Sequence, residues 1–397
     1  MRKTFLFILL TSFIACQNNS IDVTPVQTTI DNIKQKYAPD KRVARFQVEA
    51  VPVGEKIVLR GETNLPDAKE EFLSQIDSEQ FQIIDSIQML PAAALAGNTY
   101  GVVNLSACNI RSKPKHSAEL GTQSTLGTPL RVLKKDESGW YLIQTPDDYF
   151  GWLDPGGFEL MNEAKYQNWL ASERVIYTKN FGFAYVAADE NSAHVSDLLE
   201  GNILQKIGEE ATFTQVRFPD GREAFIPTNS AESYSNWLIS RQPTAENILA
   251  KANEFMGRPY LWGGTSGKGV DCSGFTKTVF YLNGVMLPRD ASQQVHTGVE
   301  VPTDTTWASL QAGDLLFFGR KATENKKERV THVAIYSGDG KIIHSSGIVT
   351  VESLRRGDPT FTEYRFNTFL RAKRPLASLG KNGIEILATS PYYKTEI

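Results

Sequence analysis

The stretch GVDCSGFTKTVFYLNG at 269–284 holds one of only three cysteines in a chain of 397 residues. Apolar residues recur in it at helical spacing, namely Phe275, Val279 and Leu282. Asp271 is a good N-cap residue, which puts Cys272 at the first helical position. There the helix N-terminus favours a thiolate over a thiol. The stretch therefore predicts a nucleophilic cysteine, although Cys272 also continues the apolar stripe and, taken alone, fits a core residue equally well.

A thiolate nucleophile needs a base, and two of the five histidines lie close together in THVAIYSGDGKIIHSSG at 331–347. The segment predicts a hairpin whose turn contains Gly-Asp-Gly. If the register puts His344 directly or diagonally opposite His332, their Cβ atoms lie roughly 5 to 8 Å apart. A two-residue turn would shift the register and put them on opposite faces. The pattern predicts one histidine as base and the other as its orienter.

A zinc site made by the same cysteine and histidines is the competing interpretation. It needs a fourth ligand, and neither a CxxC nor an HExxH motif accompanies these residues. We therefore expect no metal and no cofactor.

The beginning of the chain predicts export. MRKTFLFILLTSFIAC at 1–16 has a basic start, a short apolar stretch and a small residue before Cys16. Its end resembles a bacterial lipoprotein box, in which Cys16 becomes the lipidated first residue, although Phe13 departs from the usual Leu. A plain secretory signal is the alternative. We expect an exported lipoprotein of the cell envelope, anchored in a membrane and facing the periplasm or the surface.

Charge and cysteine usage narrow the function further. The chain has 42 Lys and Arg against 45 Asp and Glu, with no basic run, so nucleic acid is an unlikely partner. In an oxidising compartment cysteines usually pair, but only Cys108 and Cys272 remain after Cys16. No spacing suggests a disulfide framework, so we expect a thiol that stays unpaired in such a compartment to have a function.

The pattern of expected strands, turns and helices divides the chain into successive regions. A repeated segment, YQNWLAS at 166–172 and YSNWLIS at 234–240, marks two copies of one module of short strands. We predict the following boundaries: a signal peptide at 1–16, a tether and small α+β region at 17–97, small β-barrels at 98–165 and 166–241, an α/β catalytic domain at 242–374, and a tail at 375–397.

Four motifs in order resemble the NlpC-type cell-wall endopeptidases, a branch of the papain-like cysteine peptidases. They are RPYLWGGTSGKGVDCSGF, LPRDASQQ, LQAGDLLFF and THVAIYSGDGKIIHS. The two β modules resemble bacterial SH3-type domains. The resemblance implies a multidomain chain with two small β-barrel SH3-like domains, a C-terminal α+β papain-like catalytic domain and a small N-terminal α+β region.

Carried over residue by residue, the resemblance implies Cys272 as nucleophile, His332 as general base and His344 as third member. It places Tyr260 near the oxyanion, although Tyr260 also fits a core aromatic. Further positions match residues that line the substrate site or bind the free amine of the peptide; these are Asp271, Ser273, Asp290 and Ser292.

The architecture looks like that of γ-D-glutamyl-L-diamino acid endopeptidases. In these, a glutamate and a tyrosine of the first SH3-type domain close the cleft and restrict it to a free N-terminal L-alanine. Glu119 and Tyr149 match by placement, the alternatives being a solvated charge and a core tyrosine. The implied reaction is hydrolysis of peptidoglycan stem peptides with release of L-Ala-γ-D-Glu. An acyltransferase or amidase on the same scaffold, or an inert wall-binding lipoprotein, are the other hypotheses.

Overall fold

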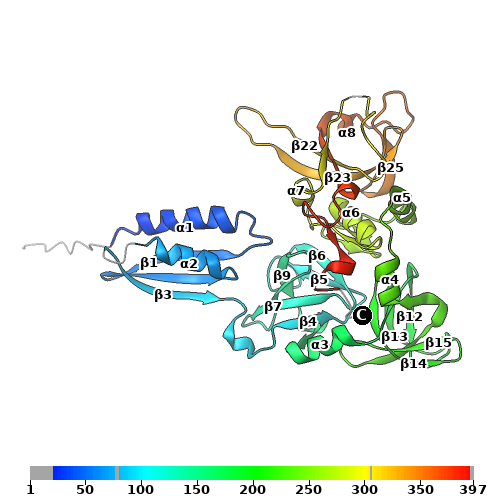
Figure 1. Ribbon diagram of the computed structural model, residues 1–397, viewed down its shortest axis with the longest axis horizontal. Coiled ribbons are helices and arrows are strands. Elements are labelled where there is room, and N and C mark those ends of the chain that lie inside the picture. The colour runs from blue at the N-terminus through cyan, green and yellow to red at the C-terminus, as the bar shows by residue number, and fades with distance from the viewer. Residues whose placement is uncertain (1–20, 77–79, 305, 394–397) are drawn as a thin grey trace, which may run out of the picture. The chain divides into compact units, whose positions relative to one another are not determined.

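The computed structural model describes residues 21–76, 80–304 and 306–393. The predicted signal peptide, with Cys16, lies outside these residues. The chain divides into two compact units, one up to Leu90 and one from Pro91, whose elements Figure 1 labels. Within the described residues, no helix is both long and apolar enough to cross a membrane.

Unit 1 is a three-stranded sheet with two helices. Its elements are α1 (Thr24–Tyr37), β1 (Phe46–Val53), β2 (Lys56–Thr63), α2 (Pro66–Ser74) and β3 (Gln82–Met89). β1 and β2 are antiparallel, while β2 and β3 are parallel and connected through α2. The polar segment predicted as a tether is helical from Thr24, because Val26, Ile30 and Ile33 form one apolar face that packs in the core.

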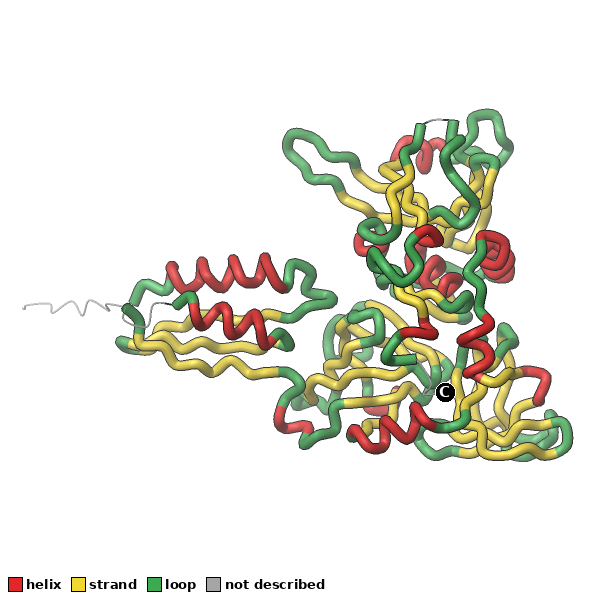
Figure 2. The backbone as a smooth tube through the Cα atoms, viewed as in Figure 1, coloured by secondary structure: helices red, strands yellow, loops and turns green. Residues whose placement is uncertain are grey.

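Unit 2 begins with two modules built mainly of strands, as Figure 2 shows. Module 1, residues 100–171, contains β4 (Tyr100–Val103), β5 (Ala107–Arg111), β6 (Leu120–Thr125), β7 (Pro129–Lys135), β8 (Tyr141–Gln144), β9 (Phe150–Leu153), β10 (Phe158–Met161) and α3 (Glu163–Ala171). Module 2, residues 174–240, contains β11 (Arg174–Tyr177), β12 (Phe181–Tyr185), β13 (His194–Leu199), β14 (Ile203–Glu210), β15 (Phe213–Arg217), β16 (Glu223–Pro227), β17 (Ala231–Ser233) and α4 (Tyr234–Ser240).

The two modules share one topology. The strand order is β6-β5-β9-β8-β7-β4-β10 in module 1 and β13-β12-β16-β15-β14-β11-β17 in module 2, which is the same sequence of positions. Each sheet is followed by the helix that carries the repeated Tyr-x-Asn-Trp segment. The predicted duplication is therefore confirmed by the order of the strands.

The prediction of closed barrels was wrong. In each sheet the two end strands do not pair with one another, so the sheet stays open. In module 1 the open edge is covered instead, because Gln123 of β6 accepts a hydrogen bond from Thr265 Oγ1 at 2.8 Å and donates its N–H to the same oxygen at 3.2 Å. An edge that another segment covers does not need closure to be protected.

The remaining residues of unit 2 form a six-stranded antiparallel sheet with helices. The order is β21-β26-β22-β23-β24-β25. The elements are α5 (Ala245–Glu254), β18 (Thr265–Ser266), β19 (Gly269–Val270), α6 (Cys272–Tyr281), β20 (Val285–Met286), α7 (Ala291–Gln294), β21 (Val299–Val301), β22 (Leu315–Arg320), β23 (Arg329–Gly338), β24 (Lys341–Ser346), β25 (Ile348–Ser353), α8 (Glu363–Thr368), β26 (Phe369–Arg374) and β27 (Glu385–Ile386).

Helix α6 is held against this sheet by a fully buried core. Phe275 and Val279 of the helix pack with Phe317, Val333 and Ile335 of β22 and β23. Phe275 and Val279 belong to the apolar stripe seen in the sequence. Their packing holds the helix in place and thereby fixes the position of its first residue, Cys272.

The segment predicted as a tail is folded. β27 pairs with β20, and Tyr234 donates a hydrogen bond to the carbonyl of Tyr393 at 3.2 Å. Tyr393 shares one buried cluster with Trp169 and Trp237, the tryptophans of the two repeated segments. The repeats thus form part of a common core that joins both modules to the C-terminal segment.

Removing the partner of Lys277 is expected to destabilise unit 2. Lys277 of α6 and Asp147 of module 1 form an ion pair with side chains 15% and 4% exposed. Asp147→Ala leaves a buried ammonium without a counter-charge, which costs about 3–5 kcal/mol of unfolding free energy. Urea unfolding measures this loss, and the double variant Asp147→Leu with Lys277→Met should regain most of it.

The matched control is Glu137→Ala, an exposed carboxylate of the same module. It should change the unfolding free energy by less than about 0.5 kcal/mol. An Asp147→Ala protein as stable as this control would contradict the importance of the pair.

Candidate active site

Cys272 lies at the first position of α6, as predicted. Asp271 is the N-cap and accepts a hydrogen bond from the backbone N–H of Gly274 at 2.7 Å. Cys272 is only 8% exposed, and the backbone N–H of Val333, the residue after His332, donates to its sulfur. The helix start and strand β23 therefore meet at the thiol.

Burial of Cys272 opposes the thiolate that the helix start was expected to favour. Burial raises the pKa of Cys272 to about 11, and the charge of Asp271 adds to this effect. The hydrogen bond from Val333 and the charge of Arg289 act in the opposite direction. Burial and the neighbouring carboxylate thus act against the effect expected of the helix N-terminus.

The hairpin brings the two histidines together through a bulge. Asp339 and Gly340 form a two-residue turn with positive φ angles of 51° and 73°, which pairs Gly338 with Lys341. If this register continued along the hairpin, His332 and His344 would lie on opposite faces of the sheet. A bulge between Tyr336 and Gly338 shifts the pairing by one residue, so that Ile335 pairs with Ile343.

As a result, His332 and His344 lie on the same side, in the diagonal arrangement that was predicted. His332 Nε2 is 2.8 Å from His344 Nδ1, and the two side chains are 6% and 0% exposed. Burial, followed by the charge of Arg365, holds the pKa of His332 well below its usual range. His332 is therefore neutral near neutral pH, as a general base must be.

Tyr260 is placed next to the thiol. Its backbone N–H donates to the carbonyl of Gly347 at 2.8 Å, which ties it to the end of β24. Burial raises the pKa of Tyr260 to about 12, with the charge of Cys272 as the next cause. The phenol thus remains a hydrogen-bond donor beside Cys272.

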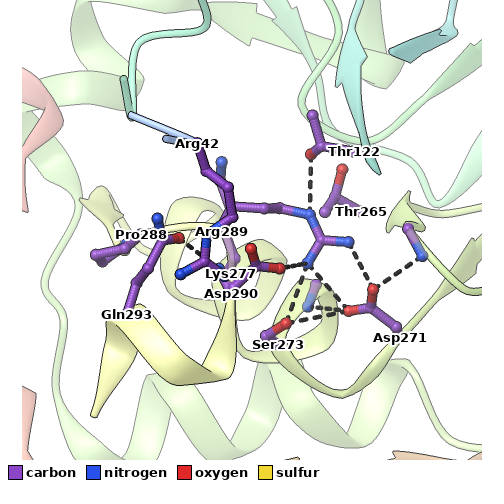
Figure 3. A network of polar contacts seen from close by, with 12 residues as sticks. Arg42, Thr122, Thr265, Asp271, Ser273, Lys277, Pro288, Arg289, Asp290 and Gln293 are labelled. Carbon is purple, nitrogen blue, oxygen red and sulfur yellow. Dashed lines mark hydrogen bonds and ion pairs between the residues drawn. The ribbon is translucent and has the colours of Figure 1, made fainter. Parts of the chain in front are cut away.

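Asp271 and Ser273 belong to a buried polar network that Figure 3 shows. Arg289, 1% exposed, donates to Asp271 Oδ2 at 2.6 Å, to Ser273 Oγ at 3.0 Å and to Thr122 Oγ1 of β6 at 3.0 Å. The backbone N–H of Gly263 also donates to Asp271, at 2.9 Å. These hydrogen bonds engage the carboxylate inside the protein, so Asp271 supports the site rather than presenting a free ligand.

Asp290 follows Arg289 and begins α7. Its backbone N–H donates to Gln293 Oε1 at 3.0 Å in a capping box, and its carboxylate lies 4.0 Å from Arg289. Ser292 lies two residues further along the same helix. This loop is thereby attached to the network that holds the start of α6.

Module 1 brings its two predicted residues to the catalytic domain. Glu119 accepts a hydrogen bond from Trp262 Nε1 at 2.8 Å. Tyr149 lies over Gly121, where an added Cβ would be 3.4 Å from its ring, and its charge is one of the causes that raise the pKa of Arg289. Glu119 therefore contacts the loop that carries Tyr260, and Tyr149 acts on the residue before Asp290.

The sequence interpretation missed three polar residues of the site. Arg289 was hidden in a turn-like Pro-Arg-Asp sequence. Glu352 lies 3.2 Å from His344 Nε2, and Arg365 lies 4.0 Å from the same carboxylate. The signal for Glu352 was its place two residues beyond the partner of His344 on the next strand, which requires the register of β25.

Comparisons with known proteins agree with this geometry. Residues 257–366 match the NlpC/P60 family, and residues 110–156 match the bacterial dipeptidyl-peptidase Sh3 domain. A solved structure of an NlpC/P60 family protein from Bacillus cereus covers 70% of this chain and 100% of its own, with a TM-score of 0.59 at 24% identity. This likeness shows the shared fold.

Two relatives are γ-D-glutamyl-L-lysine dipeptidyl-peptidases. That of Bacillus cereus is 32% identical over 57% of this chain and 67% of its own length. That of Bacillus subtilis is 34% identical over 58% of this chain and 68% of its own. The alignments extend well beyond the catalytic motifs, and the chain belongs to the NlpC/P60 family.

Proposed function

We propose that this protein is a cysteine endopeptidase that cleaves peptidoglycan stem peptides between γ-D-glutamate and the L-diamino acid, with release of L-Ala-γ-D-Glu. The observation that carries the proposal is the buried pair of His332 and His344 beside Cys272 at a helix N-terminus. The named relatives support the class of enzyme and the bond. A cysteine peptidase was the predicted class.

The mechanism begins from a thiol and a neutral imidazole. As Cys272 attacks the γ-carbonyl, its proton passes to His332, whose low pKa keeps it free to accept. The backbone N–H of Cys272 and the hydroxyl of Tyr260 stabilise the oxyanion. His332 then protonates the leaving amine, and later activates the water that hydrolyses the thioester.

The free amine of the substrate is bound by carboxylates at the end of the cleft. Glu119 of module 1 and Asp290 of α7 are the proposed partners, since a carboxylate holds an ammonium through charge-assisted hydrogen bonds. Trp262 orients Glu119 by the hydrogen bond of 2.8 Å. Tyr149 and Ser292 complete this proposed pocket, while Asp271 and Ser273 keep its floor in place through Arg289.

An acyltransferase or amidase remains the second function, because the same thioester can be passed to another acceptor. Free L-Ala-γ-D-Glu would indicate hydrolysis, and a new amide or ester would indicate transfer. An inert wall-binding lipoprotein is disfavoured by the assembled Cys272, His332 and His344.

The location proposed is the bacterial cell envelope. Peptidoglycan as substrate supports an extracellular or envelope site, and the sequence at 1–16 supports export with a lipid anchor on Cys16. We also infer that module 2 is a second SH3-like domain, because its strand order repeats that of module 1.

Cleavage of L-Ala-γ-D-Glu-diaminopimelate tests the activity. The wild-type chain should release L-Ala-γ-D-Glu, and Cys272→Ala should lower the rate at least about 1000-fold because the nucleophile is absent. Mass spectrometry of the products measures both. Absence of cleavage by the wild-type chain would contradict the proposed bond, and a new amide or ester product would favour the transferase.

An N-acetylated copy of the same peptide tests the amine pocket. Acetylation removes the ammonium, so kcat/KM should fall about 10- to 100-fold. Glu119→Gln should reduce this preference for the free amine, whereas Glu137→Gln, an exposed control in the same module, should leave it intact. Equal cleavage of both peptides by the wild-type chain would remove Glu119 and Asp290 from recognition.

Alkylation of Cys272 tests its protonation state. Because the pKa of the thiol is about 11, reaction with iodoacetamide should quicken about tenfold per pH unit from pH 7 to 10. Labelling of Cys272→Ala gives the background from the other cysteines, of which Cys108 is buried in module 1. A rate that levels off below pH 7 would instead mean a stable thiolate.

Incorporation of labelled palmitate tests the anchor. Wild-type protein expressed in bacteria should take up palmitate and sediment with membranes, because acyl chains partition strongly into a bilayer. Cys16→Ser should lose both properties, while Cys272→Ser should keep them. Unlabelled wild-type protein in the soluble fraction would favour a plain secretory signal.

A further inference from the structure

His344, the second histidine of the site, can carry its proton on either ring nitrogen, a choice that an asparagine or aspartate at this position would not have. A neutral imidazole carries its proton on either Nδ1 or Nε2. If His344 carries it on Nδ1, it donates to His332 Nε2, and neutral His332 then holds its own proton on Nδ1. That nitrogen is the one left to accept from Cys272, so this arrangement blocks general-base catalysis.

The opposite arrangement is productive. With its proton on Nε2, His344 accepts a hydrogen bond at Nδ1 from the Nε2–H of His332, at the observed distance of 2.8 Å. The lone pair of His332 Nδ1 is then free for the proton of Cys272. The tautomer of His344 therefore decides whether His332 can act.

Glu352 is placed to determine which ring nitrogen of His344 carries the proton. Strand β25 pairs Ile342 with Glu352 and His344 with Thr350, so Glu352 and His344 are diagonal neighbours on one side of the ladder. Glu352 Oε2 lies 3.2 Å from His344 Nε2. Both atoms are buried, and within the described part of the chain neither makes a hydrogen bond of regular geometry, so each has only the other at 3.2 Å.

The carboxylate is ionised and can only accept. The contact with His344 lowers the pKa of Glu352 below its usual range, although burial acts in the opposite direction. Arg365 Nε lies 4.0 Å from the same oxygen, and Arg365 is held in turn by a hydrogen bond from its Nη2 to Ser346 Oγ at 3.1 Å. An acceptor-only group at Nε2 requires a proton there.

We propose that Glu352 is a positioning residue that fixes the tautomers of both histidines, with protons on Nε2 of His344 and Nε2 of His332, so that His332 Nδ1 faces the thiol as a base. The proposal rests on the proposed function, in which Cys272 and His332 exchange a proton. In this role Glu352 acts through His344, the residue it contacts at 3.2 Å.

Nitrogen NMR of the full chain tests the proposal without substrate. In protein with ¹⁵N-labelled histidine at pH 8, the shifts of the ring nitrogens report which one carries the proton, and His344→Gln assigns the signals. We expect Nε2–H on both His332 and His344. Nδ1–H on His344 in the wild-type chain would overturn the proposal.

Glu352→Gln tests the same point by substitution. Its amide can turn an N–H toward His344 Nε2, which favours the unproductive tautomer, as when the carboxylate of a Ser-His-Asp triad becomes an amide. We expect His344 to shift toward Nδ1–H and kcat to fall about 10²- to 10⁴-fold, with KM changed less than about threefold. Unchanged tautomers with unchanged kcat would overturn the proposal.

Two controls separate the possible failures. Glu363→Gln changes an exposed carboxylate of neighbouring helix α8 and should leave spectra and kcat as in the wild-type chain. If the wild-type chain cleaves no peptide but shows Nε2–H on both histidines, the proposed substrate fails while the proton arrangement stands. A loss of kcat in Glu352→Gln with wild-type tautomers would also overturn the role proposed for Glu352.

Discussion

The ion pair of Arg289 and Asp271 is the interaction on which the site depends. Its side chains are 1% and 9% exposed, and charges so deeply buried are tolerated only when their hydrogen bonds are satisfied. Asp271 caps α6 and holds the loop at Gly263, while Arg289 reaches Thr122 of module 1. One pair thus joins the helix that begins at Cys272, the loop before it and strand β6 of module 1.

The same pair contributes to the acidity of the nucleophile. The charge of Asp271 raises the pKa of Cys272 and that of Arg289 lowers it, so the two effects oppose each other while burial dominates. The net effect favours the thiol over the thiolate. This makes the position and tautomer of His332 more important than they would be for a stable thiolate, and the bulge that aligns the histidines becomes part of the catalytic design.

Much of this arrangement follows from local sequence, and the rest depends on register. Cys272 at the helix start and the neighbouring histidines could be predicted, because capping and hairpin patterns are short-range. The bulge after Tyr336 was missed, although Gly338, with a φ of 106°, is the kind of residue that marks one, and it cancels the shift caused by the two-residue turn. Glu352 and Arg289 escaped because their partners come from other strands and loops. The prediction of closed barrels was wrong for a similar reason. The edge of β6 is covered by Thr265, a contact from another part of the chain that the pattern of short strands does not reveal.

Duplication of the module has led to two different ways of contacting the catalytic domain. Module 1 contributes buried contacts next to the nucleophile, through Thr122, Gln123 and Asp147. Module 2 contributes apolar contacts, in which Tyr234 and Trp237 pack with Met286, and several polar pairs. The polar pairs are Asp197 with Lys268 at 2.9 Å, Glu200 with Lys251 at 2.6 Å and Asn180 with Arg258 at 2.7 Å. Exposed pairs stabilise by only about 0–1 kcal/mol each, whereas buried and satisfied networks fix one geometry. Modules of one topology therefore contact the C-terminal domain in different ways: module 1 reaches the residues around Cys272 through Thr122, and module 2 uses polar pairs and a shared apolar cluster.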